Sequence, residues 1–131
     1  MKSQSIARLR YFLPSIFSLL GLLASCQSAE EKLQDHLTNP KAGDVYVVSY
    51  QPAGSTKPSY FYYQLVRFTA DSAFFHPARL EVTTADLSLE KEPNLFNPDD
   101  IKSFSRQELR EFTQAQPGDA YKILLTTIRR E

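Results

Sequence analysis

Several side chains that commonly build sites or cross-links are scarce in this chain. Its 131 residues contain one cysteine, Cys26, two histidines, His36 and His76, and no tryptophan. One cysteine excludes a disulfide within the chain, and a structural zinc site needs about three or four clustered ligands. The two histidines lie 40 residues apart. We therefore predict a domain without disulfides, metal or cofactor.

A long hydrophobic run is missing as well. Residues 11–25 carry no charge, but these roughly 15 residues are fewer than the ~20 that a membrane-spanning helix needs. Lys2, Arg8 and Arg10 precede the run, and no acid accompanies them. A basic segment followed by a short apolar run is typical of a secretory signal. We predict that residues 1–25 are a cleaved signal peptide.

The predicted signal ends in Leu23-Ala24-Ser25, and Cys26 follows. An aliphatic residue, two small residues and a cysteine in this place resemble the lipobox of bacterial lipoproteins. The resemblance implies cleavage between Ser25 and Cys26, a lipid on the Cys26 thiol, and a fatty acid such as palmitate on the new amino terminus. If Cys26 is not part of a lipobox, it is either a chance residue of an ordinary secretory signal or a free thiol of the exported protein.

The resemblance also implies that acylated Cys26 inserts into a lipid bilayer, and it bears on which membrane that is. In bacteria with two membranes, an aspartate after the lipid-bearing cysteine retains lipoproteins in the inner membrane, and here Gln27 stands at that position. We therefore expect an exported protein, anchored in the outer membrane on its periplasmic face or at the cell surface. Stable anchoring takes more than one acyl chain, and a triacylated cysteine meets that need.

The chain that remains after cleavage, residues 26–131, is short and mildly acidic. Its 106 residues suit one domain. Three of the 15 basic residues belong to the signal, so 15 acidic and 12 basic residues give a net charge of −3. Nucleic-acid binders carry a basic patch, so we expect no nucleic-acid partner. We divide this part into a lipidated tether, residues 26–42, and one β-rich domain, residues 43–131.

The tether contains a short helix-permissive segment over residues 28–38. Ser28 and Glu31 have the spacing of a capping box at its start, and Pro40 ends it. We expect a tether with one or two helical turns that could dock on the domain. His36 lies in this segment without a second ligand nearby, so we expect its side chain to be solvent-exposed.

The body is dominated by strand patterns rich in β-branched and aromatic residues. The predicted strands cover residues 45–51, 59–71, 72–77 and 119–131, and residues 79–84 extend or restart the third. The first two face each other across a loop and should pair as a hairpin. Residues 86–98 have no clean period and two prolines, which indicates a long surface loop.

Residues 99–114 allow two interpretations. One is a single long helix. The other is a short strand over residues 101–104, followed by a helix over residues 106–114 that Ser105 and Glu108 begin as a capping box. We favour the second, because serines flank Phe104 in an alternation that suits a strand.

This order of elements predicts a mainly β protein. We expect a small curled antiparallel sheet, or a Src-homology-3-like barrel, of about five strands with a short helix before the last strand. The body also loosely resembles uncharacterised small lipoproteins that open with Pro-x-x-Gly-Asp-x-Tyr, here Pro40, Gly43, Asp44 and Tyr46. That resemblance implies no activity.

Catalytic patterns are not found in the sequence. There is no Gly-x-Ser-x-Gly nucleophile elbow. His76 stands between Phe75 and Pro77, as a histidine at the end of a strand does, and Asp99 and Asp100 are adjacent, so on a strand they face opposite ways. We predict that the protein is not an enzyme and has no catalytic residue.

Aromatic residues are the remaining clue, with seven tyrosines and nine phenylalanines. Tyr46, Tyr50, Tyr60 and Tyr62 could form one cross-strand binding patch, or their rings could fill the core. We predict a non-catalytic binding or interaction module at the cell envelope, with an envelope protein as partner. The alternative is an inhibitor or immunity-type lipoprotein that neutralises an exported enzyme or toxin.

Overall fold

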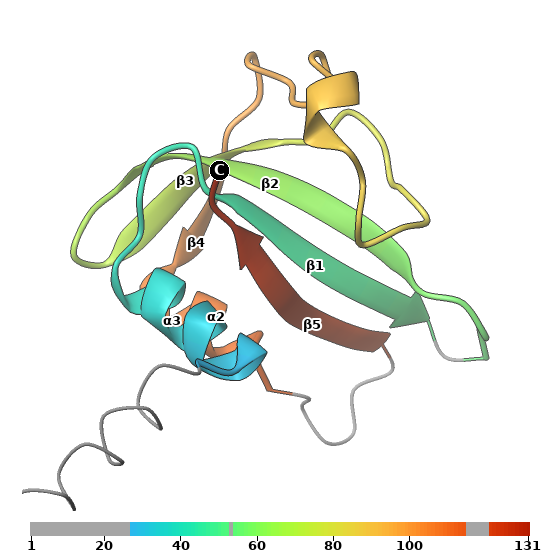
Figure 1. Cartoon of the computed structure of the whole chain (residues 1–131), viewed down its shortest axis with the longest axis horizontal. Helices are drawn as coiled ribbons and strands as arrows, with labels where there is room; N and C mark the ends of the chain where they lie inside the picture. The colour runs from blue at the N-terminus through green and yellow to red at the C-terminus, as the bar shows by residue number, and fades with distance from the viewer. Residues whose placement is uncertain (1–26, 53, 115–120) are drawn as a thin grey trace, which may run out of the picture.

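A computed structural model describes residues 27–52, 54–114 and 121–131 of the protein (Figure 1). In this part of the chain, five strands form one antiparallel sheet in the order β4-β3-β2-β1-β5. The strands are β1 (Val45–Pro52), β2 (Ser59–Phe68), β3 (Ser72–Pro77), β4 (Lys102–Ser105) and β5 (Tyr121–Arg129). The predicted mainly β fold is confirmed, as a curled open sheet rather than a closed barrel.

The predicted hairpin is also confirmed. In β1 and β2, Val45 pairs with Gln64 at one end and Tyr50 with Ser59 at the other. β3 continues the meander, and β5 returns from the far end of the chain to lie beside β1. β1 is therefore an inner strand, and its regular alternation of side chains supplies both faces of the sheet.

The chain after the long loop forms a strand and then a helix, as we favoured. β4 is followed directly by α3 (Arg106–Glu111). Ser105 Oγ accepts a hydrogen bond from the Glu108 amide at 2.9 Å, and Glu108 Oε1 accepts one from the Ser105 amide at 3.2 Å. This capping box fixes the start of the helix. The helix ends at Glu111 rather than at residue 114.

The sheet buries side chains on both faces. We call the side that α2 (Ala29–Thr38) and α3 cover the helix face, and the side that the segment around η2 (Leu89–Lys91) covers the loop face (Figure 1). The core of the helix face consists of Leu33, Leu37, Tyr46, Leu65, Ala73, Phe75, Leu109, Leu125 and Ile128. The core of the loop face consists of Val45, Val47, Tyr62 and Leu95.

Residues 86–98 are more than the surface loop that we expected. Leu95 is buried, and Leu87, Leu89 and Phe96 pack against the same cluster. The segment shows no period because η2 is only three residues long and the rest is irregular, yet its apolar side chains still cover the loop face. A search for hydrophobic periodicity misses such a segment, because its apolar residues are not regularly spaced.

The predicted tether helix belongs to the folded unit. Leu33 and Leu37 of α2 are buried in the helix-face core, so α2 docks on the sheet. The expectation of a solvent-exposed His36 is wrong: its side chain is half-buried, and its Nδ1 lies 3.2 Å from the Ile128 carbonyl oxygen of β5. Ser28 Oγ accepts the hydrogen bond from the Glu31 amide that the cap requires.

Candidate functional site

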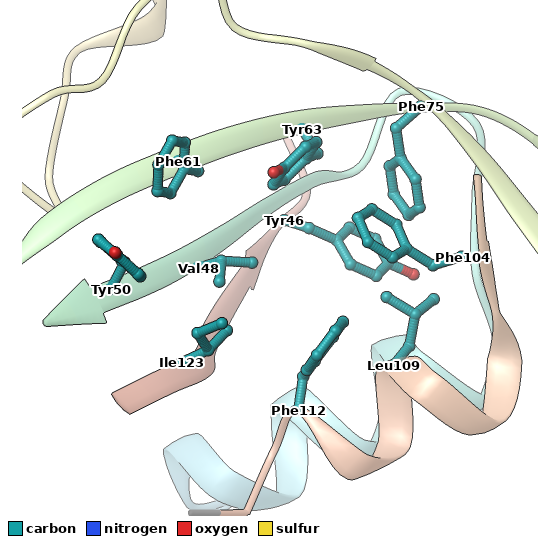
Figure 2. Close-up of a pocket in the computed structure, with 10 residues that line it drawn as sticks. All are labelled: Tyr46, Val48, Tyr50, Phe61, Tyr63, Phe75, Phe104, Leu109, Phe112 and Ile123. Carbon is teal, nitrogen blue, oxygen red and sulfur yellow. The ribbon is translucent and has the colours of Figure 1, made fainter. Parts of the chain in front are cut away.

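An apolar pocket of about 270 Å³ lies between the sheet and α3 on the helix face (Figure 2). All five strands and α3 contribute to it. Its walls consist of Tyr46, Val48, Tyr50, Phe61, Tyr63, Phe75, Phe104, Leu109, Phe112 and Ile123. Protein pockets for small ligands are commonly about 300–1,000 Å³ and mostly apolar, so this one is apolar like them but slightly smaller.

The alternation of the strands explains which residues reach the pocket. Tyr46, Val48 and Tyr50 are two residues apart along β1 and therefore share one face. The pocket is deep at one end and open at the other. The exposed fractions of the wall residues show this: Phe75 is 0% exposed and Tyr46 1%, whereas Ile123 is 40% exposed. Ile123 thus marks the mouth, and Phe75 the floor.

Edge-to-face contacts between aromatic rings hold the walls. Ring centroids are 4.8 Å apart for Tyr46 and Phe75, 5.6 Å for Tyr63 and Phe104, and 5.8 Å for Phe104 and Phe112. Such a pair contributes about 0.5–1.5 kcal/mol beyond simple burial. Because each ring contacts another, the wall is ordered by its own packing.

The pocket is also electrically neutral. None of its ten lining residues carries a charge. Burial raises the pKa of Tyr46 to about 12, with a further contribution from the negative charge of Asp44, while Arg106 and Arg130 lower it. Burial also raises the pKa of Tyr63. Tyrosine is already protonated at neutral pH, so burial moves the ionisation of both phenols further above it.

The structure does not bring the four tyrosines of the expected patch into one surface. Tyr46 and Tyr50 line the pocket on the helix face, whereas Tyr60 and Tyr62 belong to the loop face. Val47 pairs with Tyr62 and Ser49 with Tyr60. Directly paired residues share a face, so the neighbours Tyr46 and Tyr50 point to the opposite side.

Tyr62 has a structural role on the loop face. Its side chain is 1% exposed. Its hydroxyl donates to the Thr84 carbonyl oxygen at 2.9 Å and accepts from the Leu87 amide at 3.1 Å. The ring thus fills the core, and its polar end ties the irregular segment to the sheet.

Most of the pocket was not predicted from the sequence. The residues not singled out there are Val48, Phe61, Tyr63, Phe75, Phe104, Leu109, Phe112 and Ile123. The sequence did indicate part of the pocket. Phe61 and Tyr63 lie on one face of one predicted strand, and Val48 lies between two tyrosines on one face of another. Whether the residues of the two strands share one face depends on the pairing register of β1 and β2, which the expected hairpin did not specify.

The histidines and adjacent acids form no cluster in the described residues. His76 Nδ1 lies 3.0 Å from the backbone carbonyl oxygen of Asp100. Within residues 27–52, 54–114 and 121–131, no group of three histidine, cysteine or acidic side chains could hold a metal ion. The absence of catalytic activity stays a prediction.

The Gly-Asp pair of the Pro-x-x-Gly-Asp-x-Tyr motif supports the fold. Gly43 has a φ of +97°, in the region that favours glycine. Asp44 is 1% exposed, and its Oδ1 and Oδ2 accept hydrogen bonds from Arg130 Nε and Nη2, both at 2.9 Å. The Lys41 amide donates to Oδ2 at the same distance. Of this motif, only Tyr46 lines the pocket.

The predicted cleavage and lipid-attachment residues, Ser25 and Cys26, lie outside the described residues, as does the predicted signal peptide over residues 1–25. Among the helices that the structure describes, none has the length and apolarity to cross a membrane. Comparison of the chain with models of protein families, with curated proteins and with solved structures finds no match.

Proposed function

We propose that this protein is a non-catalytic binding module, anchored by acylated Cys26 in a bacterial outer membrane, and that the helix-face pocket is its binding site. The observation that carries the binding part is the pocket itself, an aromatic and uncharged space with a partly exposed mouth. Apolar pockets are the usual sites for small molecules. The lipobox-like Leu23-Ala24-Ser25-Cys26 supports the anchor.

The position of α2 gives the proposal a geometric consequence. α2 begins at Ala29, three residues after Cys26, and three extended residues span at most about 11 Å. Leu33 and Leu37 fix α2 to the core. A lipid on Cys26 would therefore hold the domain close to the bilayer surface, without a long flexible stalk.

Metabolic labelling tests the anchor. Cells that express the full chain receive an alkyne analogue of palmitate, and the protein is then isolated and the membranes are separated. We expect label on the wild-type protein, recovery in the outer-membrane fraction, and loss of both in Cys26→Ala. Unlabelled wild-type protein, or an uncut leader in its mass spectrum, would contradict the proposal.

Gln27→Asp is the matched control, because it leaves the lipid-bearing cysteine in place. If the lipoprotein sorting signal operates, this variant keeps its label but moves to the inner membrane. A variant that is labelled and stays in the outer membrane would show that residue 27 does not set the location.

A further inference from the structure

We propose that the helix-face pocket takes the hydrocarbon part of a small uncharged molecule, with about nine non-hydrogen atoms inside the protein. This inference deepens the proposed function and rests on it, since it names the ligand class for the same site. The size follows from the volume of about 270 Å³, which corresponds to about nine waters at about 30 Å³ each. A cavity of about 150 Å³ accepts benzene, so this pocket has room for one such ring with a short chain.

The lining decides against a charged ligand. The pocket offers no charged side chain, and its tyrosines are neutral phenols at neutral pH, as tyrosines ordinarily are. An ion that entered would lose hydration without gaining an ionic partner. A hydrocarbon chain has no ionic hydration to lose, and the burial of its apolar surface is favourable.

Aromatic rings can also bind cations, quaternary ammonium groups among them, but they do so over open ring faces. Here the rings contact one another edge to face: Phe75 meets both Tyr46 and Tyr63, and Phe104 meets Phe112. Ring faces that already receive the edge of a neighbour are less available to a cation. The packing therefore favours a neutral apolar guest.

The exposure of the walls gives the direction of entry. Ile123 at the mouth is 40% exposed, and Tyr50 and Phe61 beside it are half-buried. Phe75 and Leu109 at the floor are buried. A ligand would enter past Ile123 with its apolar end first and leave its polar end at the mouth, where water remains.

Photolabelling in membranes tests the site with the full chain as the cell produces it. The probe is a neutral alkyl diazirine alcohol of about eight carbons with a terminal alkyne, and unlabelled n-octanol is the competitor. After irradiation, mass spectrometry of peptides locates the adducts. We expect adducts on residues that line the pocket, and we expect excess n-octanol to suppress them.

Two tryptophan variants distinguish labelling in the pocket from nonspecific labelling of the protein surface. Ile123→Trp narrows the mouth, and Leu80→Trp enlarges a side chain that is 62% exposed and not part of the pocket. We expect pocket labelling to fall at least about tenfold, equivalent to about 1.4 kcal/mol, in Ile123→Trp and to stay unchanged in Leu80→Trp. Val48→Phe, which fills the pocket from within, should repeat the loss. Circular dichroism checks that each variant folds.

Adducts that spread over Phe68, Leu80 and Ile101, which are exposed outside the pocket, would overturn the inference. Labelling that n-octanol does not reduce would also overturn it, as would stronger competition by tetramethylammonium than by n-octanol. Labelling that a bound polypeptide blocks, and that n-octanol does not, would likewise replace the small ligand by a protein side chain. A lipidated protein with an unlabelled pocket contradicts only the ligand. Pocket labelling on a protein without lipid contradicts only the anchor.

Discussion

At the residue scale, Tyr46 connects the core to the candidate site. Its ring is 1% exposed, packs edge to face on Phe75 and forms part of the pocket floor. Burial costs the phenolate more than the phenol, which is why its pKa rises to about 12. The same desolvation that makes the pocket apolar therefore links this tyrosine to alkaline stability.

Tyr46 should make stability fall as the pH rises from about 10, the usual pKa of tyrosine, to about 12. In this window the unfolded chain loses the proton while the folded protein keeps it, so ionisation favours unfolding. In Tyr46→Phe, we expect urea unfolding at alkaline pH to show a shallower decline, by up to about 1.4 kcal/mol per pH unit. Equal slopes for the two proteins would contradict the raised pKa.

At the element scale, α2 is the helix whose role changed most between sequence and structure. Its cap at Ser28 was predicted correctly, because the hydrogen bond to the Glu31 amide depends on residues three apart. The sequence left its docking open, because two leucines four apart indicate an apolar stripe but do not identify the surface that covers it. The half-buried His36 follows from that docking.

Docking of α2 predicts a large effect for Leu37→Ala. Leu37 is 7% exposed, and truncation of a buried leucine to alanine costs about 2–5 kcal/mol. Gln34→Ala changes an exposed residue of the same helix and should leave stability within about 0.5 kcal/mol. Denaturant unfolding measures both. If Leu37→Ala behaves like the control, then α2 is not part of the cooperative unit.

At the scale of the whole molecule, Arg130 joins segments that are far apart in the chain. It forms an ion pair with the buried Asp44, 86 residues away, and its Nη2 also donates to the Asn39 carbonyl oxygen, just after α2, at 2.8 Å. The hydrogen bond with Asp44 is the main reason that the pKa of Arg130 is raised. The end of β5, the turn before β1 and the end of α2 are thus held at one point.

Arg130→Ala should destabilise the protein by about 2–3 kcal/mol, since it leaves the Asp44 carboxylate buried without its cation. We place the effect below the range for fully buried pairs because the Arg130 side chain is 29% exposed. Arg110→Ala removes the same charge from an exposed site on α3 and serves as the control. Thermal unfolding at neutral pH compares the two variants, and equal melting temperatures would contradict the role of the pair.

The sequence by itself determined the features that depend on neighbours a few residues apart. These include the alternation of the strands, the hairpin, and the capping box of Ser105 and Glu108, together with the lipobox-like pattern that supports the proposed anchor. Only the tertiary structure decided which aromatic rings meet, that residues 86–98 cover the loop face, and that Tyr46 and Tyr62 lie on opposite sides of the sheet. The physical reason is that pairing register and packing join residues distant in the chain, and no local pattern specifies those contacts.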